Sequence, residues 1–128
     1  MKLLLDTSAL LWWYKEPALL SRNVYAAIFE ERWQIYVSAA SAWEIATKVR
    51  LGKLPEAARL IERFDRYIAE QNFLAISITT HHARLGGGLA SPRKDPFDRI
   101  IAAQAQIEDM PIATTDKAFE TLGVRIFW

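Results

Sequence analysis

Cysteine is absent from the 128 residues of this chain. Its absence excludes disulfide bonds and thiolate metal sites, and it suits a reducing compartment such as the cytoplasm, where we expect the protein to act. Overall charge is also scarce, because the formal net charge is only +1, so an anionic partner must be bound by local basic residues. Apolar residues never run uninterrupted for about 18 positions, and Asp6 breaks the apolar start. We therefore expect neither a membrane-spanning helix nor a signal peptide.

The remaining composition is that of an ordinary globular protein, with 52% apolar and 24% charged residues. No internal repeat, low-complexity tract or linker divides the chain. A chain of this length most simply forms one domain, which we expect to span residues 1–128.

Predicted strands alternate with predicted helices along the chain. Short apolar runs predict strands at residues 2–5, 34–37, 73–78, 111–114 and 124–127. Helical spacing and capping residues predict helices at 7–15, 21–32, from Ser38 or Ser41 to about 51, 55–71, 79–85, 96–108 and 116–122, with 86–94 as a loop. This alternation predicts an α/β fold in which helices cover both faces of a mainly parallel sheet of about five strands.

Four acidic residues fall near the carboxyl ends of these strands or in the first turns of the helices that follow. They are Asp6, Glu44, Asp98 and Asp116. The carboxyl ends of parallel strands meet at one edge of a sheet, where α/β proteins place their sites. We therefore expect the four carboxylates to surround one crevice.

A cluster of carboxylates is unfavourable without a cation, because like charges raise each other's pKa. Oxygen-only ligands select hard divalent ions such as Mg²⁺ or Mn²⁺. An ion of this kind can activate water and screen a phosphodiester, so the four acids predict metal-assisted phosphate hydrolysis.

Each acid also has a structural explanation when it is considered alone. Glu44 stands three residues after Ser41, which is a capping-box spacing, and four before Lys48, which is a helix ion-pair spacing. Helix capping could account for Asp6, Asp95 and Asp116, with Asp98 as an acid in the first turn after Asp95. The functional interpretation depends on all four pointing to one edge of the sheet.

Four segments resemble the motifs of the PIN-domain ribonucleases, in particular VapC-like toxins of bacterial type II toxin–antitoxin pairs. In chain order they read LLLDTSALLWW, SAASAWEIATKVRLGKL, KDPFDRIIAAQA and PIATTDKAF. The third segment is the most specific, and the order and spacing match over essentially the whole chain. The resemblance implies a PIN-like three-layer α/β/α sandwich.

The resemblance also implies an activity, namely Mg²⁺- or Mn²⁺-dependent endonucleolytic cleavage of RNA. It assigns the catalytic and metal-binding positions to Asp6, Glu44, Asp98 and Asp116, with supporting roles for Asp95, Thr7, Ser8, Thr114 and Thr115. The partners that it implies are an RNA substrate, a cognate VapB-like antitoxin and a second copy of the chain in a homodimer.

Basic and aromatic residues near these motifs could also contact RNA. Arg93, Lys94 and Arg99 could bind phosphates, although exposed charge explains them equally well. Aromatic side chains can stack on unpaired bases. Packing in the core or in an interface is the favoured interpretation of Trp12, Trp13, Tyr14 and Trp43.

Other classes of protein fit the sequence less well. A binding module like a response-regulator receiver needs its acceptor Asp at a strand end, whereas Asp98 lies inside a predicted helix. A phosphatase of the haloacid-dehalogenase type needs D-x-D after its first strand, where this chain reads D-T-S. The alternative that stays open is a non-catalytic PIN-like module that binds RNA or protein, although the presence of all four acids argues against it.

Overall fold

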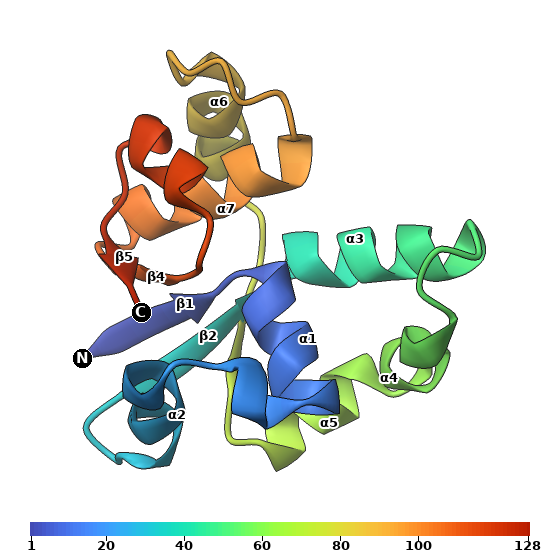
Figure 1. Ribbon diagram of the computed structural model, residues 1–128. Coiled ribbons are helices and arrows are strands. Elements are labelled where there is room, and N and C mark those ends of the chain that lie inside the picture. The colour runs from blue at the N-terminus through green and yellow to red at the C-terminus, as the bar shows by residue number, and fades with distance from the viewer.

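The computed structural model describes residues 1–128 and is built around one parallel sheet of five strands (Figure 1). The strands are β1 (Lys2–Leu5), β2 (Gln34–Ser38), β3 (Leu74–Ile76), β4 (Ile112–Ala113) and β5 (Ile126–Phe127). Their order in the sheet is β3-β2-β1-β4-β5, and all four pairs are parallel. The chain adds β2 and β3 on one side of β1 and then β4 and β5 on the other. The order therefore reverses between β1 and β4, where α/β sheets open a crevice.

Helices cover both faces of this sheet. The α-helices are α1 (Thr7–Lys15), α2 (Arg22–Phe29), α3 (Ala39–Arg50), α4 (Ala58–Glu62), α5 (Phe64–Glu70), α6 (Thr80–Gly88) and α7 (Pro96–Ile107). Three short 3₁₀ helices complete the chain: η1 (Pro17–Leu19), η2 (Pro55–Ala57) and η3 (Lys117–Leu122). Helices α1, α2, α4 and α5 lie on one side of the sheet, and α6, α7 and η3 lie on the other (Figure 1). No helix is both long enough and apolar enough to cross a membrane.

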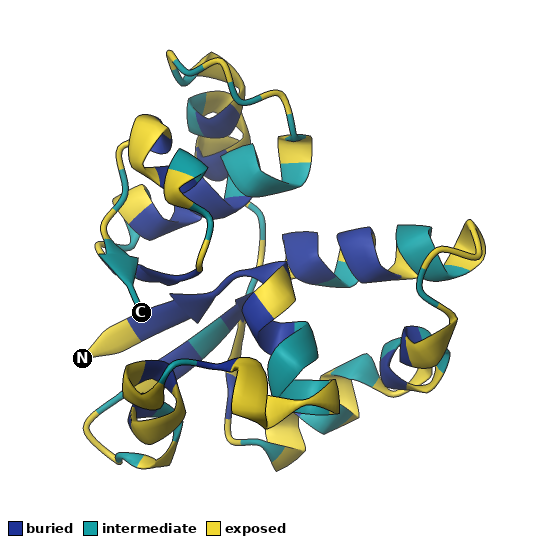
Figure 2. Cartoon of the chain, viewed as in Figure 1, coloured by how far each residue is buried: buried dark blue, intermediate teal, exposed yellow.

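Strand β1 supplies side chains to two separate apolar cores, because successive residues of a strand point to opposite faces. Leu3 and Leu5 join the cluster that includes Leu10 and Val24 from α1 and α2. Leu4 joins the other cluster, formed mainly by α7 and the segment that ends in η3. All three leucines are fully buried, and Figure 2 shows burial along the central strands and the helix sides that face them. The predicted three-layer α/β/α architecture is confirmed.

The predicted helix at residues 55–71 is wrong in its continuity. The segment consists of η2, α4 and α5, and the break between α4 and α5 lies at Arg63, whose φ of −120° and ψ of 26° are not helical. The break still allows Leu60 from α4 and Ile68 from α5 to reach the same core. Apolar periodicity records which side chains are buried, and it does not detect a single residue that leaves the helix.

The predicted loop at 86–94 is also wrong at its start, because Gly86, Gly87 and Gly88 form the last turn of α6. A Cβ atom at Gly86 would lie 3.0 Å from the backbone oxygen of Arg99 in α7. Glycine is therefore required there by the close approach of two helices and does not mark a loop.

The other differences concern the ends of elements. The predicted helix at 21–32 stops at Phe29, and the strands predicted at 73–78 and 124–127 are shorter, as β3 and β5. The last predicted helix is the 3₁₀ helix η3. Hydrogen bonding to β2 and to β4 sets the limits of β3 and β5, and the sequence pattern does not contain it.

Candidate active site

The carboxyl ends of the three central strands lie level with one another. Leu5 is in register with both Val37 of β2 and Ala113 of β4. The residues that follow these positions are Asp6, Ser38 and Thr114, so three polar side chains begin the same edge of the sheet. Asp6 then turns the chain into α1, and its Oδ1 accepts a hydrogen bond of 2.7 Å from the Ala9 backbone N–H. The helix cap places a carboxylate at the end of the central strand.

This edge carries a cleft of about 210 Å³ into which all four predicted acids project. Asp6 comes from the β1–α1 junction, Glu44 from α3, Asp98 from the first turn of α7, and Asp116 from the start of η3. Asp95, the N-cap of α7, also lines the cleft. The hydroxyl residues there are Thr7, Ser8 and Thr115, and the cations are Lys48 and Arg93. The structure therefore brings together side chains that are far apart in the sequence.

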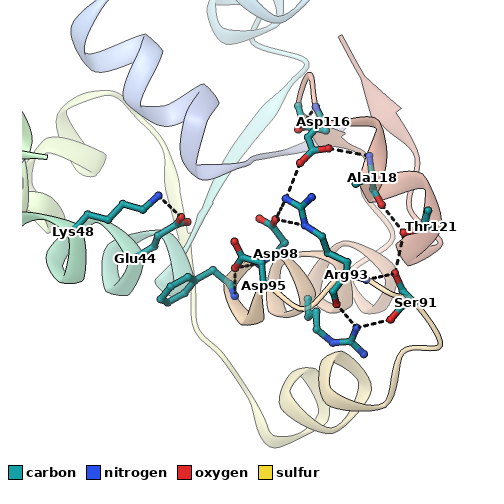
Figure 3. A network of polar contacts seen from close by, with 12 residues as sticks. Glu44, Lys48, Ser91, Arg93, Asp95, Asp98, Asp116, Ala118 and Thr121 are labelled. Carbon is teal, nitrogen blue, oxygen red and sulfur yellow. Dashed lines mark hydrogen bonds and ion pairs between the residues drawn. The ribbon is translucent and has the colours of Figure 1, made fainter. Parts of the chain in front are cut away.

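Arg93 joins two of the acids directly (Figure 3). Its Nε donates to Asp98 Oδ2 at 2.9 Å, and its Nη2 contacts the same oxygen. Nη2 also donates to Asp116 Oδ2 at 2.7 Å. The hydrogen bond with Asp98 raises the pKa of Arg93, so its guanidinium remains a cation.

Glu44 is paired with a cation from its own helix. Its Oε2 accepts a hydrogen bond of 2.8 Å from Lys48 Nζ, which confirms the predicted spacing of four residues. The capping-box explanation for Glu44 is wrong, because α3 begins at Ala39 and Ser38 is its N-cap. The residue is only 7% exposed. Both Glu44 and its half-exposed partner Lys48 line the cleft.

Burial changes the acidity of two of these carboxyl groups. The pKa of Asp6 is raised to about 6, chiefly by desolvation; contacts with Thr114 and the Ala9 N–H oppose the rise, and the charges of Asp98 and Glu44 add to it. Burial also raises the pKa of Asp98, against the opposing effect of Arg93. Carboxyl groups whose pKa values are raised in this way gain stability from an added cation.

The supporting residues predicted from the sequence take different positions. Thr7 shares a buried hydrogen bond of 3.0 Å with the Ser41 hydroxyl, while Ser8 and Thr115 are exposed at the cleft. Thr114 is buried, and its Oγ1 accepts a hydrogen bond from the backbone N–H of Asp116. Thr114 therefore does not line the cleft itself but helps to hold the backbone of Asp116, which does.

Two of the three predicted phosphate-binding cations do not line the cleft. Lys94 is exposed outside it. The Arg99 guanidinium donates to backbone oxygens at the end of α6 and in the loop that follows, including Gly86 at 2.9 Å and Arg93 at 2.7 Å. Arg99 therefore holds the backbone of the loop that carries Arg93.

Trp43 stands apart from the aromatic residues that pack inside the protein. Its exposed fraction is 56%, whereas Trp12, Trp13 and Tyr14 pack against the core cluster that contains Leu3 and Leu5. Its ring meets that of Phe97 edge-on, with centroids 4.7 Å apart. Trp43 adjoins Glu44 and Phe97 adjoins Asp98, so this aromatic pair lies beside the acids.

Sequence reasoning missed one buried residue that helps to hold this edge together. Gln104 of α7 is fully buried, and its Oε1 accepts a hydrogen bond of 2.5 Å from the Ser38 hydroxyl. Its Nε2 donates to the Ser77 backbone oxygen at 3.2 Å. A polar residue inside the apolar run IIAAQA was the available signal, because buried polar groups need partners.

The model of the PIN domain family matches residues 3–124, which is nearly the whole chain. The chain belongs to the PIN domain family. No protein in the curated set matches the sequence of this PIN domain. PIN domains are in general nucleases.

Solved structures similar to this PIN domain share its fold at low sequence identity. VapBC2 from Rickettsia felis, bound to a DNA fragment from its promoter, matches with a TM-score of 0.73 and 15% identity over 99% of this chain and 98% of that chain. FitAcB from Neisseria gonorrhoeae matches with 0.65 and 22% over 98% and 96%. A toxin–antitoxin complex from Klebsiella pneumoniae matches with 0.59 and 21% over 91% and 88%.

The residues of the cleft fit a hard divalent cation by their donor chemistry. The acidic and hydroxyl side chains offer only oxygen atoms as ligands. Asp6, Asp98 and Glu44 repel one another, and a cation between them would reduce this repulsion. In the structure no three acidic or histidine side chains are gathered as ligands of one ion. Arg93 and Lys48 instead engage these carboxylates. Binding of an ion therefore requires carboxylates to exchange partners.

Proposed function

We propose that this PIN domain is a metal-dependent endoribonuclease that hydrolyses RNA phosphodiester bonds. The observation that carries the proposal is the convergence of Asp6, Glu44, Asp98 and Asp116 on one cleft at the reversal point of the sheet. Repulsion between the carboxylates disfavours such a cluster, and a bound divalent cation would relieve it. The membership of a family whose members are in general nucleases supports the same activity.

We further propose that the protein is the toxin of a type II toxin–antitoxin pair. The support comes from its structural relatives, which include VapBC2 and a toxin–antitoxin complex and which it matches over nearly the full length of both chains. A VapB-like antitoxin, a homodimeric assembly and a cytoplasmic location belong to this proposal.

The four acids would hold Mg²⁺ or Mn²⁺. A bound divalent ion supplies activation of water and screening of the phosphodiester charge. Asp6 has the least freedom, because it is 7% exposed and fixed by its cap to α1. Asp98 and Glu44 flank it with side chains that are 14% and 9% exposed. This rigid wall would set the position of the scissile phosphate.

The other side of the cleft is more open to solvent. The Asp116 side chain is 40% exposed, so it is the acid best placed to accept a proton from an attacking water. The exposed hydroxyls of Ser8 and Thr115 can orient that water by hydrogen bonding. Lys48, which lines the cleft, offers positive charge for RNA phosphates.

The exposed ring of Trp43 favours a single-stranded substrate. Stacking on an aromatic side chain requires an unpaired base, and the exposed Trp43 precedes Glu44, which lines the cleft. We propose that a base adjoining the cleaved phosphate stacks on this ring.

Cleavage of defined single-stranded RNAs in Mg²⁺ or Mn²⁺ tests the enzymatic proposal. Asp98→Ala should lower the rate by about a hundredfold or more, because it removes a ligand of the ion that acts in the transition state. EDTA should abolish cleavage by the parent protein.

Asp109→Ala is the matched control, because Asp109 is exposed and pairs with Arg125 rather than with a cleft residue. It should retain the parent rate. Cleavage by Asp98→Ala at the parent rate, or full cleavage in EDTA, would contradict the proposal. RNA binding without cleavage by the parent protein would favour the non-catalytic alternative.

A further inference from the structure

We propose that Arg93 is an internal cation that occupies the Asp98–Asp116 pair and has to leave it before a divalent ion binds there. Arg93 would thereby lower the affinity of the cleft for the ion. The inference rests on the proposed function, since it concerns the same carboxylates, but it can fail independently of that function.

The geometry of Arg93 is that of a bound cation. Two of its nitrogens contact a single oxygen, Asp98 Oδ2, and one of them also contacts Asp116 Oδ2 at 2.7 Å. These two acids come from different elements, α7 and η3. The guanidinium is the only group that joins them, and its side chain is 31% exposed. Arg93 thus neutralises two carboxylates that would otherwise repel each other across the cleft.

The position of Arg93 is built into the fold through its loop. The Arg99 guanidinium donates to the Arg93 backbone oxygen at 2.7 Å and to the Ser91 backbone oxygen at 3.3 Å. The Ser91 hydroxyl also shares a hydrogen bond of 2.9 Å with that of Thr121 in η3 (Figure 3). The loop is therefore fixed to both α7 and η3, the two elements that carry the bridged acids.

A divalent ion and the Arg93 guanidinium cannot use the same carboxylate oxygens together. Mg²⁺ holds its oxygen ligands at about 2.0–2.1 Å, and a second cation on the same oxygen would be repelled. The apparent affinity for the ion equals the intrinsic affinity multiplied by the fraction of molecules in which Arg93 has left the pair. Removal of Arg93 should therefore tighten binding of the ion, and addition of the ion should release Arg93.

Calorimetric titration of the full chain with Mn²⁺ tests the first consequence. Arg93→Gln should bind Mn²⁺ about fivefold or more tightly than the parent protein. Lys94→Gln is the matched control, because it removes the same charge from the neighbouring exposed position and should stay within about twofold of the parent. Arg93→Lys keeps the charge but loses the second nitrogen that contacts Asp98 Oδ2, so it should also bind Mn²⁺ more tightly.

NMR of the arginine side chains tests the second consequence on the parent protein itself. The Nε–H signal of Arg93, assigned by its loss in Arg93→Lys, should be protected from exchange without metal. Addition of Mg²⁺ should shift it and remove that protection, because the guanidinium is released to solvent.

Several results would overturn the inference. Equal Mn²⁺ affinity of Arg93→Gln and the parent would do so, and so would an equal gain from Lys94→Gln, which would indicate general charge. An Arg93 Nε–H signal that does not change when Mg²⁺ is added would also overturn the inference. In each case the proposed nuclease stands as long as Asp98→Ala abolishes Mn²⁺ binding. If neither the parent nor any of the variants binds Mn²⁺, both proposals fail.

Discussion

Asp6 combines two roles in one side chain. Its Oδ1 caps α1 through Ala9, and its carboxyl group lies buried among other acids at the end of β1. The cap requires only a hydrogen-bond acceptor, which Asn also provides. The site requires a charge that burial disfavours. Asp6→Asn therefore separates the structural role from the electrostatic one.

We expect Asp6→Asn to be more stable than the parent at neutral pH when no divalent ion is present. The pKa of Asp6 is raised from 3.8 to about 6 in the folded protein. Between these values the folded protein holds a proton that the unfolded chain has lost, so the free energy of unfolding falls as pH rises. Above pH 6 the ionised group has cost roughly 3 kcal/mol. Asn has no charge to desolvate and avoids this cost.

Thermal unfolding between pH 4 and pH 8 measures this effect. The melting temperature of Asp6→Asn should exceed that of the parent by several degrees at pH 7.5, and the difference should vanish near pH 4. Asp6→Ala is the companion variant, because it also loses the cap and should be less stable than Asp6→Asn by about 1 kcal/mol. A pH-independent difference between the melting temperatures of Asp6→Asn and the parent would show that folding does not raise the pKa of Asp6.

Trp43 provides a second prediction at the scale of one residue. In EDTA, Trp43→Ala should weaken binding of a single-stranded RNA by roughly 5- to 150-fold, which corresponds to the 1–3 kcal/mol of one stacked base. Fluorescence anisotropy with a labelled RNA measures the change.

Phe29→Ala is the control for Trp43→Ala, because Phe29 is 64% exposed but lies on α2, across the sheet from α7. It should bind the RNA as the parent does. An equal loss in both variants, or none in Trp43→Ala, would remove Trp43 from the substrate site.

The pair α6–α7 determines where the Arg93 loop runs. Helix α6 ends in three glycines, and Arg99 donates to the backbone oxygens of Gly86 and Gly87 at that end. The last carbonyl groups of a helix lack partners within it, and a cationic side chain satisfies them well. One arginine therefore closes α6 and fixes the loop that enters the cleft.

Two neighbouring glycines of α6 should respond oppositely to the same substitution. Gly86→Ala places a Cβ 3.0 Å from the Arg99 backbone oxygen and should destabilise the protein by about 1–3 kcal/mol. Gly87→Ala meets nothing within 4 Å and should be neutral or stabilising by up to about 1 kcal/mol, because alanine favours a helix. Urea unfolding of both variants measures the difference. Equal stabilities would mean that α6 and α7 are not in close contact.

For the molecule as a whole, the order of the strands decides which segments meet. The chain builds outward from β1 on one side and returns to add β4 on the other. Segments from the beginning, middle and end of the sequence therefore share one edge. The two cores on either face of β1 hold this edge rigid from both sides.

A divalent ion bound at this edge should stabilise the whole fold, because it links β1, α3, α7 and η3. At a free concentration of one hundred times its dissociation constant, the stabilisation is about 2.7 kcal/mol. Thermal unfolding with and without Mn²⁺ should show a rise of several degrees in the parent and in Asp109→Ala. The rise should disappear in Asp98→Ala. An equal rise in Asp98→Ala would place the ion elsewhere.

The order of elements, the parallel sheet and the convergence of four acids follow from the sequence alone. Apolar runs and helical spacing identify the elements, and parallel strands place their carboxyl ends together. The capping roles of Asp6 and Asp95 are equally local, since they depend on residues at most three positions away. Such features need no knowledge of what lies across the fold.

Only the tertiary structure decided the contacts between distant segments. The bridge from Arg93 to Asp116 spans 23 positions, and the bond from Ser38 to Gln104 spans 66, so no spacing rule predicts either. The sequence pattern places Gly86 in a loop, which is wrong, because the reason for a glycine there, the backbone of Arg99, belongs to another helix. Local pattern determines which elements form. Packing and charge between elements determine which side chains meet, because those energies exist only once the chain has folded.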